Sequence, residues 1–238
     1  MIVGKQIRMI AFDADDTLWV NEPFYREVEA AIEDMLSNYV DPEKFLDLLY
    51  ERELANLRVF GYGAKGFTLS LIETVIELTD YRVTTVHIQK IIEMGKSLLT
   101  KPIEFLPDAE STIKKLSADF PLMIITKGDL FDQESKVARS GIAPLFKHVE
   151  IVSEKTPEVY RRILEQYDIA PEEFCMIGNS LKSDILPVLE IGGNAVHIPF
   201  HTTWVHEHVD PEILANYHFT TVTGIRKLTE IFNPNSDF

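Results

Sequence analysis

Short runs of apolar residues recur along the chain and indicate β-strands. The runs cover residues 7–12, 122–125, 149–152, 174–177 and 195–198, and the later ones alternate with segments of helical periodicity. Strands that are covered on both faces of a parallel sheet form continuous apolar runs of this kind. The pattern therefore predicts an α/β fold with a doubly wound parallel sheet.

A long stretch between the first two strands, residues 22–104, shows helical periodicity and contains no convincing strand. Apolar residues recur three and four positions apart in four successive stripes, which predicts four amphipathic helices. The stripes begin at Phe24, Phe45, Leu69 and Val86. We therefore expect a helical-bundle domain over residues 21–105, inserted into an α/β core domain of residues 1–20 and 106–238.

The composition is that of an ordinary globular protein, with 238 residues, 45% of them apolar and 26% charged. The formal charge of −15 argues against a nucleic-acid partner, because binding to a phosphate backbone depends on clustered Lys and Arg. A small phosphorylated ligand stays possible, since a metal ion and a few local cations can reverse the field inside a cleft. No apolar run approaches membrane-spanning length and no signal peptide is evident, so we expect a cytoplasmic protein without a membrane partner. Cys175 is the only cysteine, which excludes an intrachain disulfide and a Cys-based zinc site.

Polar side chains stand directly after several of the predicted strands. They are Asp13, Asp15 and Thr17 after the first, Thr126 after the second, Lys155 after the third and the loop 178–184 after the fourth. The carboxyl ends of parallel strands meet at one edge of a sheet, where ligands bind in open α/β folds. Carboxylates, a hydroxyl and an ammonium gathered there can bind a divalent cation and a substrate. Taken singly, each residue has an ordinary alternative, namely a polar turn, a helix cap or a surface lysine.

The four groups together resemble the sequence motifs of the haloacid dehalogenase superfamily. In that family an Asp-x-Asp-x-Thr motif is followed by a Ser or Thr, a Lys and an acidic loop. The chain has Asp13 to Thr17, then Thr126, Lys155 and the loop from Gly178 to Asp184, and four motifs in order are more specific than any one. The resemblance spans residues 13–184 and implies a Rossmann-like core, with a helical insertion similar to the first (C1) type of cap domain.

The resemblance implies distinct roles for the first motif. Asp13 corresponds to the nucleophile that takes the phosphoryl group as an aspartyl phosphate, and Asp15 corresponds to the general acid and base. The dehalogenases that name the family lack an acid at the position of Asp15. Its presence here therefore favours a phosphatase or a phosphomutase, while Asp16 is expected to shape the turn.

The later motifs imply a phosphate site and a metal site. Thr126 and Lys127 are expected to bind the substrate, and Lys155 to offset charge on the nucleophile and the phosphoryl group. The resemblance also implies a Mg²⁺ cofactor. Its expected ligands are Asp13, Asp15 through its backbone carbonyl, Asp184 and Asn179.

The chain departs from the family pattern at Asn179, where the family usually has an aspartate after the glycine. A neutral amide is a weaker ligand for a hard cation than a carboxylate, so either Asn179 or Asp184 could be the direct ligand. Pro187 implies that the next helix starts only near Ser183 or Asp184.

Two further segments carry polar residues that a site could use. Glycines 61, 63 and 66 surround Lys65, which either reaches the substrate from a well-defined loop or is a solvated residue of a helix connection. Residues 201–208 hold three histidines together with Trp204 and Glu207, at a spacing that matches no standard zinc pattern. We interpret this run as a surface segment that leads to the last strand.

These features predict a magnesium-dependent phosphatase that acts on a small phosphorylated metabolite, with the cap selecting the substrate. Two alternatives stay open. One is a phosphomutase that passes the phosphoryl group to a bound sugar phosphate, and the other is a non-catalytic metabolite-binding protein with a weakened metal site. No motif specifies the substrate or the oligomeric state.

Overall fold

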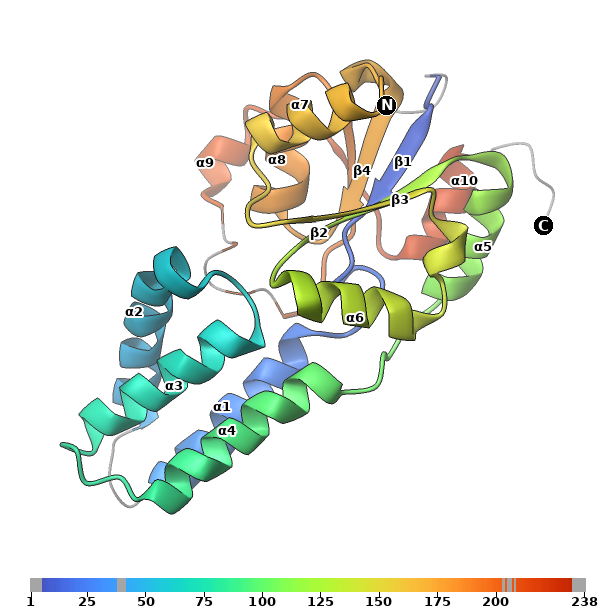
Figure 1. The fold of residues 1–238 in the computed structure, drawn as a ribbon. Coiled ribbons are helices and arrows are strands. Elements are labelled where there is room, and N and C mark those ends of the chain that lie inside the picture. Colours follow the sequence, from blue (N-terminus) through green and yellow to red (C-terminus); the bar gives the residue numbers. More distant parts are fainter. Residues whose placement is uncertain (1–5, 38–41, 203, 205–206, 208, 233–238) are drawn as a thin grey trace. The chain divides into compact units, whose positions relative to one another are not determined.

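The computed structural model describes residues 6–37, 42–202, 204, 207 and 209–232. The chain divides into two compact units, one formed by residues 1–22 and 103–238 and the other by residues 23–102. The first unit is a sheet flanked by helices, and the second is a bundle of helices (Figure 1). None of the described helices is long and apolar enough to cross a membrane.

The first unit is built on a six-stranded parallel sheet with the strand order β3-β2-β1-β4-β5-β6. The strands are β1 (Met9–Phe12), β2 (Leu122–Lys127), β3 (His148–Val152), β4 (Phe174–Gly178), β5 (Asn194–His197) and β6 (Thr220–Thr221). All five predicted apolar runs lie on strands, which confirms the doubly wound fold. The order reverses between β1 and β4, so the loops after these two neighbouring strands start side by side, where open α/β sheets bind ligands.

Alternate residues of the central strands pack into two separate cores, one on each face of the sheet. Ile10 and Phe12 pack into a core that includes residues of α5, α6 and α10, while Met9 and Ala11 pack into one that includes residues of α7 and α8. This period of two follows from strand geometry. The helices are α5 (Ala109–Asp119), α6 (Leu130–Ser140), α7 (Pro157–Gln166), α8 (Leu186–Glu190), α9 (Pro211–Leu214) and α10 (Leu228–Phe232) (Figure 1).

The turn after β1 is shaped by Asp16, as expected from the sequence. Asp16 has a φ of 59°, in the left-handed region. Its carboxylate accepts hydrogen bonds from the backbone N–H groups of Asn21 at 2.8 Å and Glu22 at 2.9 Å. These bonds satisfy backbone N–H groups at the start of the helix α1, so the role of Asp16 is structural.

The second unit contains the four predicted helices, α1 (Glu22–Leu36), α2 (Pro42–Phe60), α3 (Ala64–Leu78) and α4 (Thr85–Thr100). The helix α3 packs against both α2 and α4. Apolar residues from all four helices form one core, among them Ile32, Phe45, Leu71 and Ile91. The amphipathic stripes seen in the sequence therefore correspond to the buried faces of this bundle.

The glycine-rich segment is shorter as a loop than the sequence suggested. Gly61 and Gly63 make the turn between α2 and α3 with φ values of 72° and 109°, which glycine adopts readily. Gly66 lies within α3, where an added Cβ would come 2.8 Å from the carbonyl oxygen of Gly61. Lys65 is therefore an exposed residue in the first turn of α3, and the prediction of a loop around it is wrong.

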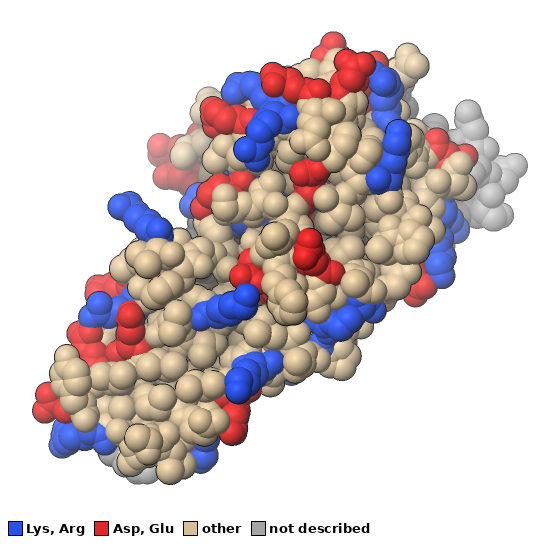
Figure 2. All heavy atoms as spheres, in the orientation of Figure 1, with Lys and Arg blue, Asp and Glu red and all other residues tan. Residues whose placement is uncertain are grey.

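The surface in Figure 2 carries acidic and basic side chains in mixture. Lys and Arg on this face are interspersed with Asp and Glu, and they form no continuous basic track. Such a face offers no extended row of cations to a phosphate backbone.

Candidate active site

Asp13 stands at the carboxyl end of β1 and is buried, with 7% of its surface exposed. Its backbone N–H donates to the carbonyl oxygen of Ile177 in β4 at 2.8 Å, which ties the ends of the two neighbouring strands together. Its side chain meets Lys155, whose Nζ lies 2.6 Å from Asp13 Oδ1. The same Nζ lies 2.7 Å from Asp184 Oδ1. Lys155 therefore joins the loops after β1 and β4.

Lys155 is placed by the short connection between β3 and α7. The helix α7 begins at Pro157, and the side chain of Thr156 caps it by accepting a hydrogen bond from Val159 N–H at 3.3 Å. Proline suits this first position because it lacks the N–H that would be unpaired there. The helix therefore begins just after Lys155, with Thr156 as its N-cap between them.

The electrostatics of this cluster favour an added cation. Burial raises the pKa of Asp13 to about 7; the charge of Lys155 opposes the shift, and the carboxylate of Asp184 reinforces it. Burial works against the charge on Lys155, but the attraction of Asp13 and Asp184 outweighs it and raises the pKa of Lys155. One ammonium group thus pairs with two buried carboxylates, which leaves an excess negative charge. A bound divalent cation would neutralise this charge.

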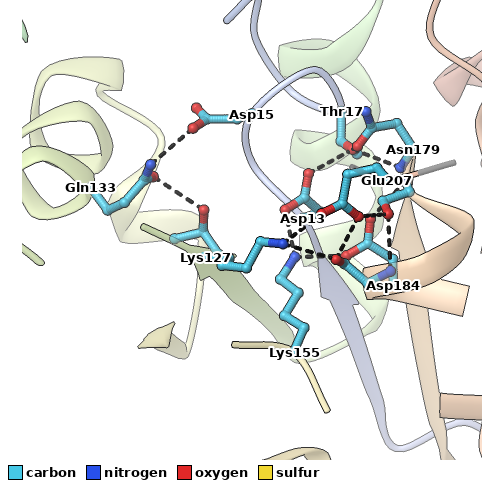
Figure 3. A network of polar contacts seen from close by, with 12 residues as sticks. Asp13, Asp15, Thr17, Lys127, Gln133, Lys155, Asn179, Asp184 and Glu207 are labelled. Carbon is cyan, nitrogen blue, oxygen red and sulfur yellow. Dashed lines mark hydrogen bonds and ion pairs between the residues drawn. The ribbon is translucent and has the colours of Figure 1, made fainter. Parts of the chain in front are cut away.

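Thr17 links the first motif to the loop after β4. Its Oγ1 lies 3.0 Å from Asp13 Oδ2 and 3.2 Å from Asn179 Oδ1, and it accepts a hydrogen bond from Asn179 N–H at 3.1 Å. The amide oxygen of Asn179 is therefore directed at Thr17, close to the nucleophile candidate (Figure 3).

Asp184 lies in a π-helical turn, Leu181–Ile185, that precedes α8. Its Oδ2 accepts a hydrogen bond from Ser180 N–H at 3.0 Å. Gly178 leaves room for this carboxylate, because a Cβ atom at Gly178 would clash with Asp184 Oδ2. The sequence predicted that the next helix starts near Ser183 or Asp184. Helical backbone begins slightly earlier, at Leu181, where the wider π turn accommodates the chain before Pro187.

The Asp15 side chain is turned away from this cluster, toward α6 (Figure 3). Its Oδ1 accepts a hydrogen bond from Trp19 Nε1 at 2.7 Å, and its Oδ2 accepts one from Gln133 Nε2 at 2.8 Å. Lys136 Nζ lies 3.1 Å from Oδ1 and 2.9 Å from Oδ2. Burial alone would raise the pKa of Asp15, but the charge of Lys136 and these hydrogen bonds outweigh it and lower the pKa.

Thr126 reaches the same network through Gln133. Thr126 is buried in β2, and its hydroxyl donates to Gln133 Oε1 at 3.1 Å. Gln133 thus joins Thr126 to Asp15. No sequence pattern singled out Gln133 or Lys136, because polar residues on an amphipathic helix are usually solvated.

A second ion pair, between Lys127 and Glu207, borders the loop after β4. Lys127 Nζ lies 2.6 Å from Glu207 Oε1 and donates to Ser183 Oγ at 3.1 Å. The other oxygen of Glu207 accepts hydrogen bonds from Ser183 Oγ, at 2.6 Å, and from Ser180 Oγ. Burial opposes the charge on Glu207, yet Lys127 and the serine hydroxyls outweigh it and lower its pKa to about 2.

Glu207 was visible in the sequence only as part of the run 201–208. Within that run His201 is exposed and lies 3.1 Å from the hydroxyl of its neighbour Thr202, while His206 and His208 fall outside the described residues. The contacts of Glu207 make this segment part of the site's surroundings. Lys65, the remaining candidate, belongs to the helical unit.

The oxygen donors at the strand ends suit a hard cation such as Mg²⁺. Among the described residues, no three His, Cys, Asp or Glu side chains converge as a ready-made metal cage. Mg²⁺ does not require one, because it is usually held by one or two carboxylates together with water and substrate phosphate. The buried carboxylates of Asp13 and Asp184, with the nearby amide of Asn179, are a donor set of this kind.

Comparison with known proteins gives a consistent result. A family model described as haloacid dehalogenase-like hydrolase matches residues 7–192. The chain is 28% identical over 201 residues to a glyceraldehyde 3-phosphate phosphatase from Pyrococcus furiosus, covering 81% of this chain and 80% of the relative. It is 28% identical over 202 residues to a protein of the same name from Methanocaldococcus jannaschii, covering 81% of this chain and 85% of the relative. A haloacid dehalogenase-like family hydrolase from Xanthomonas campestris has 46% identity and a TM-score of 0.79, covering 84% of this chain and 85% of that structure.

Proposed function

The chain belongs to the haloacid dehalogenase-like hydrolases, and from this premise we propose that it is a magnesium-dependent phosphatase that acts on a small phosphomonoester. The observation that carries the proposal is the buried contact of Lys155 with both Asp13 and Asp184. A carboxylate at the carboxyl end of the first strand, next to a cation and a second carboxylate, suits attack on a phosphoryl group.

In the first step one oxygen of Asp13 attacks phosphorus, and the bond from phosphorus to the ester oxygen breaks. Asp15 must carry a proton for this step, and it gives that proton to the departing oxygen, so that an alcohol leaves and Asp13 carries the phosphoryl group. In the second step Asp15 takes a proton from water, which attacks phosphorus, releases inorganic phosphate and restores the Asp13 carboxylate. The division replaces one difficult displacement by two easier ones.

The surrounding residues stabilise charge during both steps. Lys155 offsets the charge of Asp13 and of the phosphoryl oxygens, and Thr126 and Lys127 bind those oxygens. Bound Mg²⁺ would neutralise further charge on the phosphoryl group. It would be held by Asp13, Asp184, the Asn179 amide and the backbone carbonyl of Asp15, because Mg²⁺ prefers oxygen ligands.

The proposed substrate is a short phosphorylated metabolite of the glyceraldehyde 3-phosphate class. This choice rests on the names of the two relatives, each 28% identical over more than four-fifths of the chain. The helical unit, residues 23–102, acts as the cap in this proposal, and Lys65 in its α3 helix contributes to substrate choice.

The test is phosphate release from a panel of phosphorylated metabolites, with Mg²⁺ and with EDTA. Glyceraldehyde 3-phosphate, larger sugar phosphates and p-nitrophenyl phosphate belong in the panel. Metal-dependent release supports the proposal. Formation of an isomeric sugar phosphate without release would identify a phosphomutase, and ligand binding without turnover would leave a metabolite-binding protein.

The role of Lys65 needs a separate experiment. Lys65→Ala should change the order of preference among the panel substrates, because it removes a cation offered by the cap. Lys90 in α4 is an exposed lysine of the same unit, and Lys90→Ala serves as the matched control. An unchanged order of preference in Lys65→Ala would show that this lysine is a solvated surface residue without a part in substrate choice.

A further inference from the structure

The carboxylate of Asp15 has all of its acceptor positions in use. A carboxylate offers about four lone-pair positions, two on each oxygen. Trp19 and Lys136 contact Oδ1, and Gln133 and Lys136 contact Oδ2, all within 3.1 Å. The orientation of this side chain is therefore determined by its neighbours and not by the turn that carries it.

Two of the three donors come from one face of α6. Gln133 and Lys136 are three positions apart in this helix, so their side chains lie on the same face. Both residues are buried, with 3% and 7% of their surfaces exposed. Burying a glutamine and a lysine is costly unless each is fully hydrogen-bonded, so the pair requires a specific arrangement of partners.

The two residues are themselves held in place. Lys136 Nζ also donates to Asn21 Oδ1 at 2.8 Å and lies 3.7 Å from Asp132 Oδ2. Gln133 Oε1 accepts from Thr126, and a Cβ atom at Gly128 would come 2.9 Å from Gln133 Nε2, so glycine there leaves room for the amide. The support of Asp15 thus extends to β2 and to the turn after β1.

We propose that Gln133 and Lys136 are positioning residues, which orient the Asp15 carboxylate for proton transfer, and that Gln133 ties this orientation to Thr126. The proposal rests on the proposed function, in which Asp15 gives a proton to the leaving oxygen. Lys136 contacts both oxygens of Asp15, so it can keep Oδ1 while Oδ2 turns to the leaving group.

The leaving group of the substrate provides the test. An alkyl phosphate releases a strongly basic oxygen that needs a proton, whereas p-nitrophenyl phosphate releases a phenolate that hardly does. If Gln133 and Lys136 position the acid, variants of these two residues should lose more kcat/KM on an alkyl phosphate than on p-nitrophenyl phosphate. A merely structural role predicts similar losses on both substrates.

Gln133→Leu and Lys136→Met are compared with wild type by kcat/KM, which reports the steps up to formation of the aspartyl phosphate. Each variant should lose at least about tenfold on glyceraldehyde 3-phosphate and less than about threefold on p-nitrophenyl phosphate, as expected for a misplaced general acid. Asp15→Asn should show the same pattern more strongly. Lys136→Arg, which keeps a cation near Asp15, should recover part of the loss on the alkyl substrate.

Lys114→Met on the exposed face of α5 is the matched control and should change neither value. Gln133→Leu removes no charge, so it tests the idea even if loss of Lys136 prevents folding. Equal losses on both substrates, or no loss on either, would overturn the positioning role. Failure of the proposed function looks different, because the wild-type protein would then release phosphate from neither substrate.

Discussion

Lys155 Nζ lies 2.6 Å from Asp13 Oδ1, although 142 positions separate the two residues in the chain. Both are buried, and the same ammonium also contacts Asp184. Two carboxylates and one cation therefore share a site from which water is largely removed. This imbalance gives the first three predictions.

Asp13→Asn should abolish phosphate release while leaving the fold intact. The change removes the nucleophilic charge with little change in shape, and loss of a nucleophile typically costs at least about a thousandfold in kcat. Phosphate release with Mg²⁺ measures the effect, and circular dichroism checks the fold. Turnover within tenfold of wild type would remove Asp13 from the role of nucleophile.

The same variant should change how stability depends on pH in metal-free protein. The pKa of Asp13 is raised from 3.8 to about 7 in the folded state, so between these values the folded protein binds more protons than the unfolded chain. Stability from this group is full at low pH and is lost as the pH rises through about 7. In EDTA, the melting temperature of Asp13→Asn relative to wild type should therefore rise between about pH 5 and about pH 8, because the wild-type protein loses stability over this range. A relative melting temperature that stays constant or falls would contradict the raised pKa.

Lys155→Met should destabilise the metal-free protein by about 3 kcal/mol or more, because it leaves two buried carboxylates without their cation. Urea unfolding in EDTA measures the change. Mg²⁺ should recover more of the lost stability in Lys155→Met than it adds to Lys147→Met, a control at an exposed lysine outside the site. Equal stability of the two variants would mean that the buried ion pair contributes nothing net.

The contact between Lys127 and Glu207 should appear as a coupling energy. In a double-mutant cycle of Lys127→Met and Glu207→Gln, we expect a coupling of about 1–3 kcal/mol, because the pair is partly buried and hydrogen-bonded to serines. The free energies of unfolding of the four proteins at pH 7 give this value. Arg161 and Glu158 form an exposed ion pair 3.5 Å apart, and the same cycle there should give less than about 0.5 kcal/mol. Equal couplings at the two pairs would show that the Glu207 segment adds no more than an ordinary surface contact.

The fold and the positions of the motifs could be predicted because both are local signals. Continuous apolar runs mark buried parallel strands, and a polar residue directly after such a run marks the edge where ligands bind. Asp13, Thr126 and Lys155 were singled out as candidates in this way. The four stripes between residues 22 and 104 predicted the helical unit by the same logic, with a period of 3.6.

Local patterns do not indicate the orientation of a side chain where that orientation depends on distant residues. The sequence placed Asp15 beside Asp13, yet its carboxylate is directed by Gln133 and Lys136, 118 and 121 positions away. Glu207 had no local signal that distinguished it from a surface glutamate. Lys65 was assigned to a loop because glycines surround it, but the packing of Gly66 against Gly61 allows α3 to begin before it.

By itself the sequence determined the order of the strands along the chain, the helical insertion, and the residue types that stand at the strand ends. These follow from periodicity and from the short reach of the backbone between neighbouring residues. Only the tertiary structure decided which polar groups meet. The strand order brings Asp13 next to Asn179, the β3–α7 connection brings Lys155 between two carboxylates, and α6 sets the direction of Asp15. Such contacts depend on sheet register and helix packing, and these are properties of the assembled core.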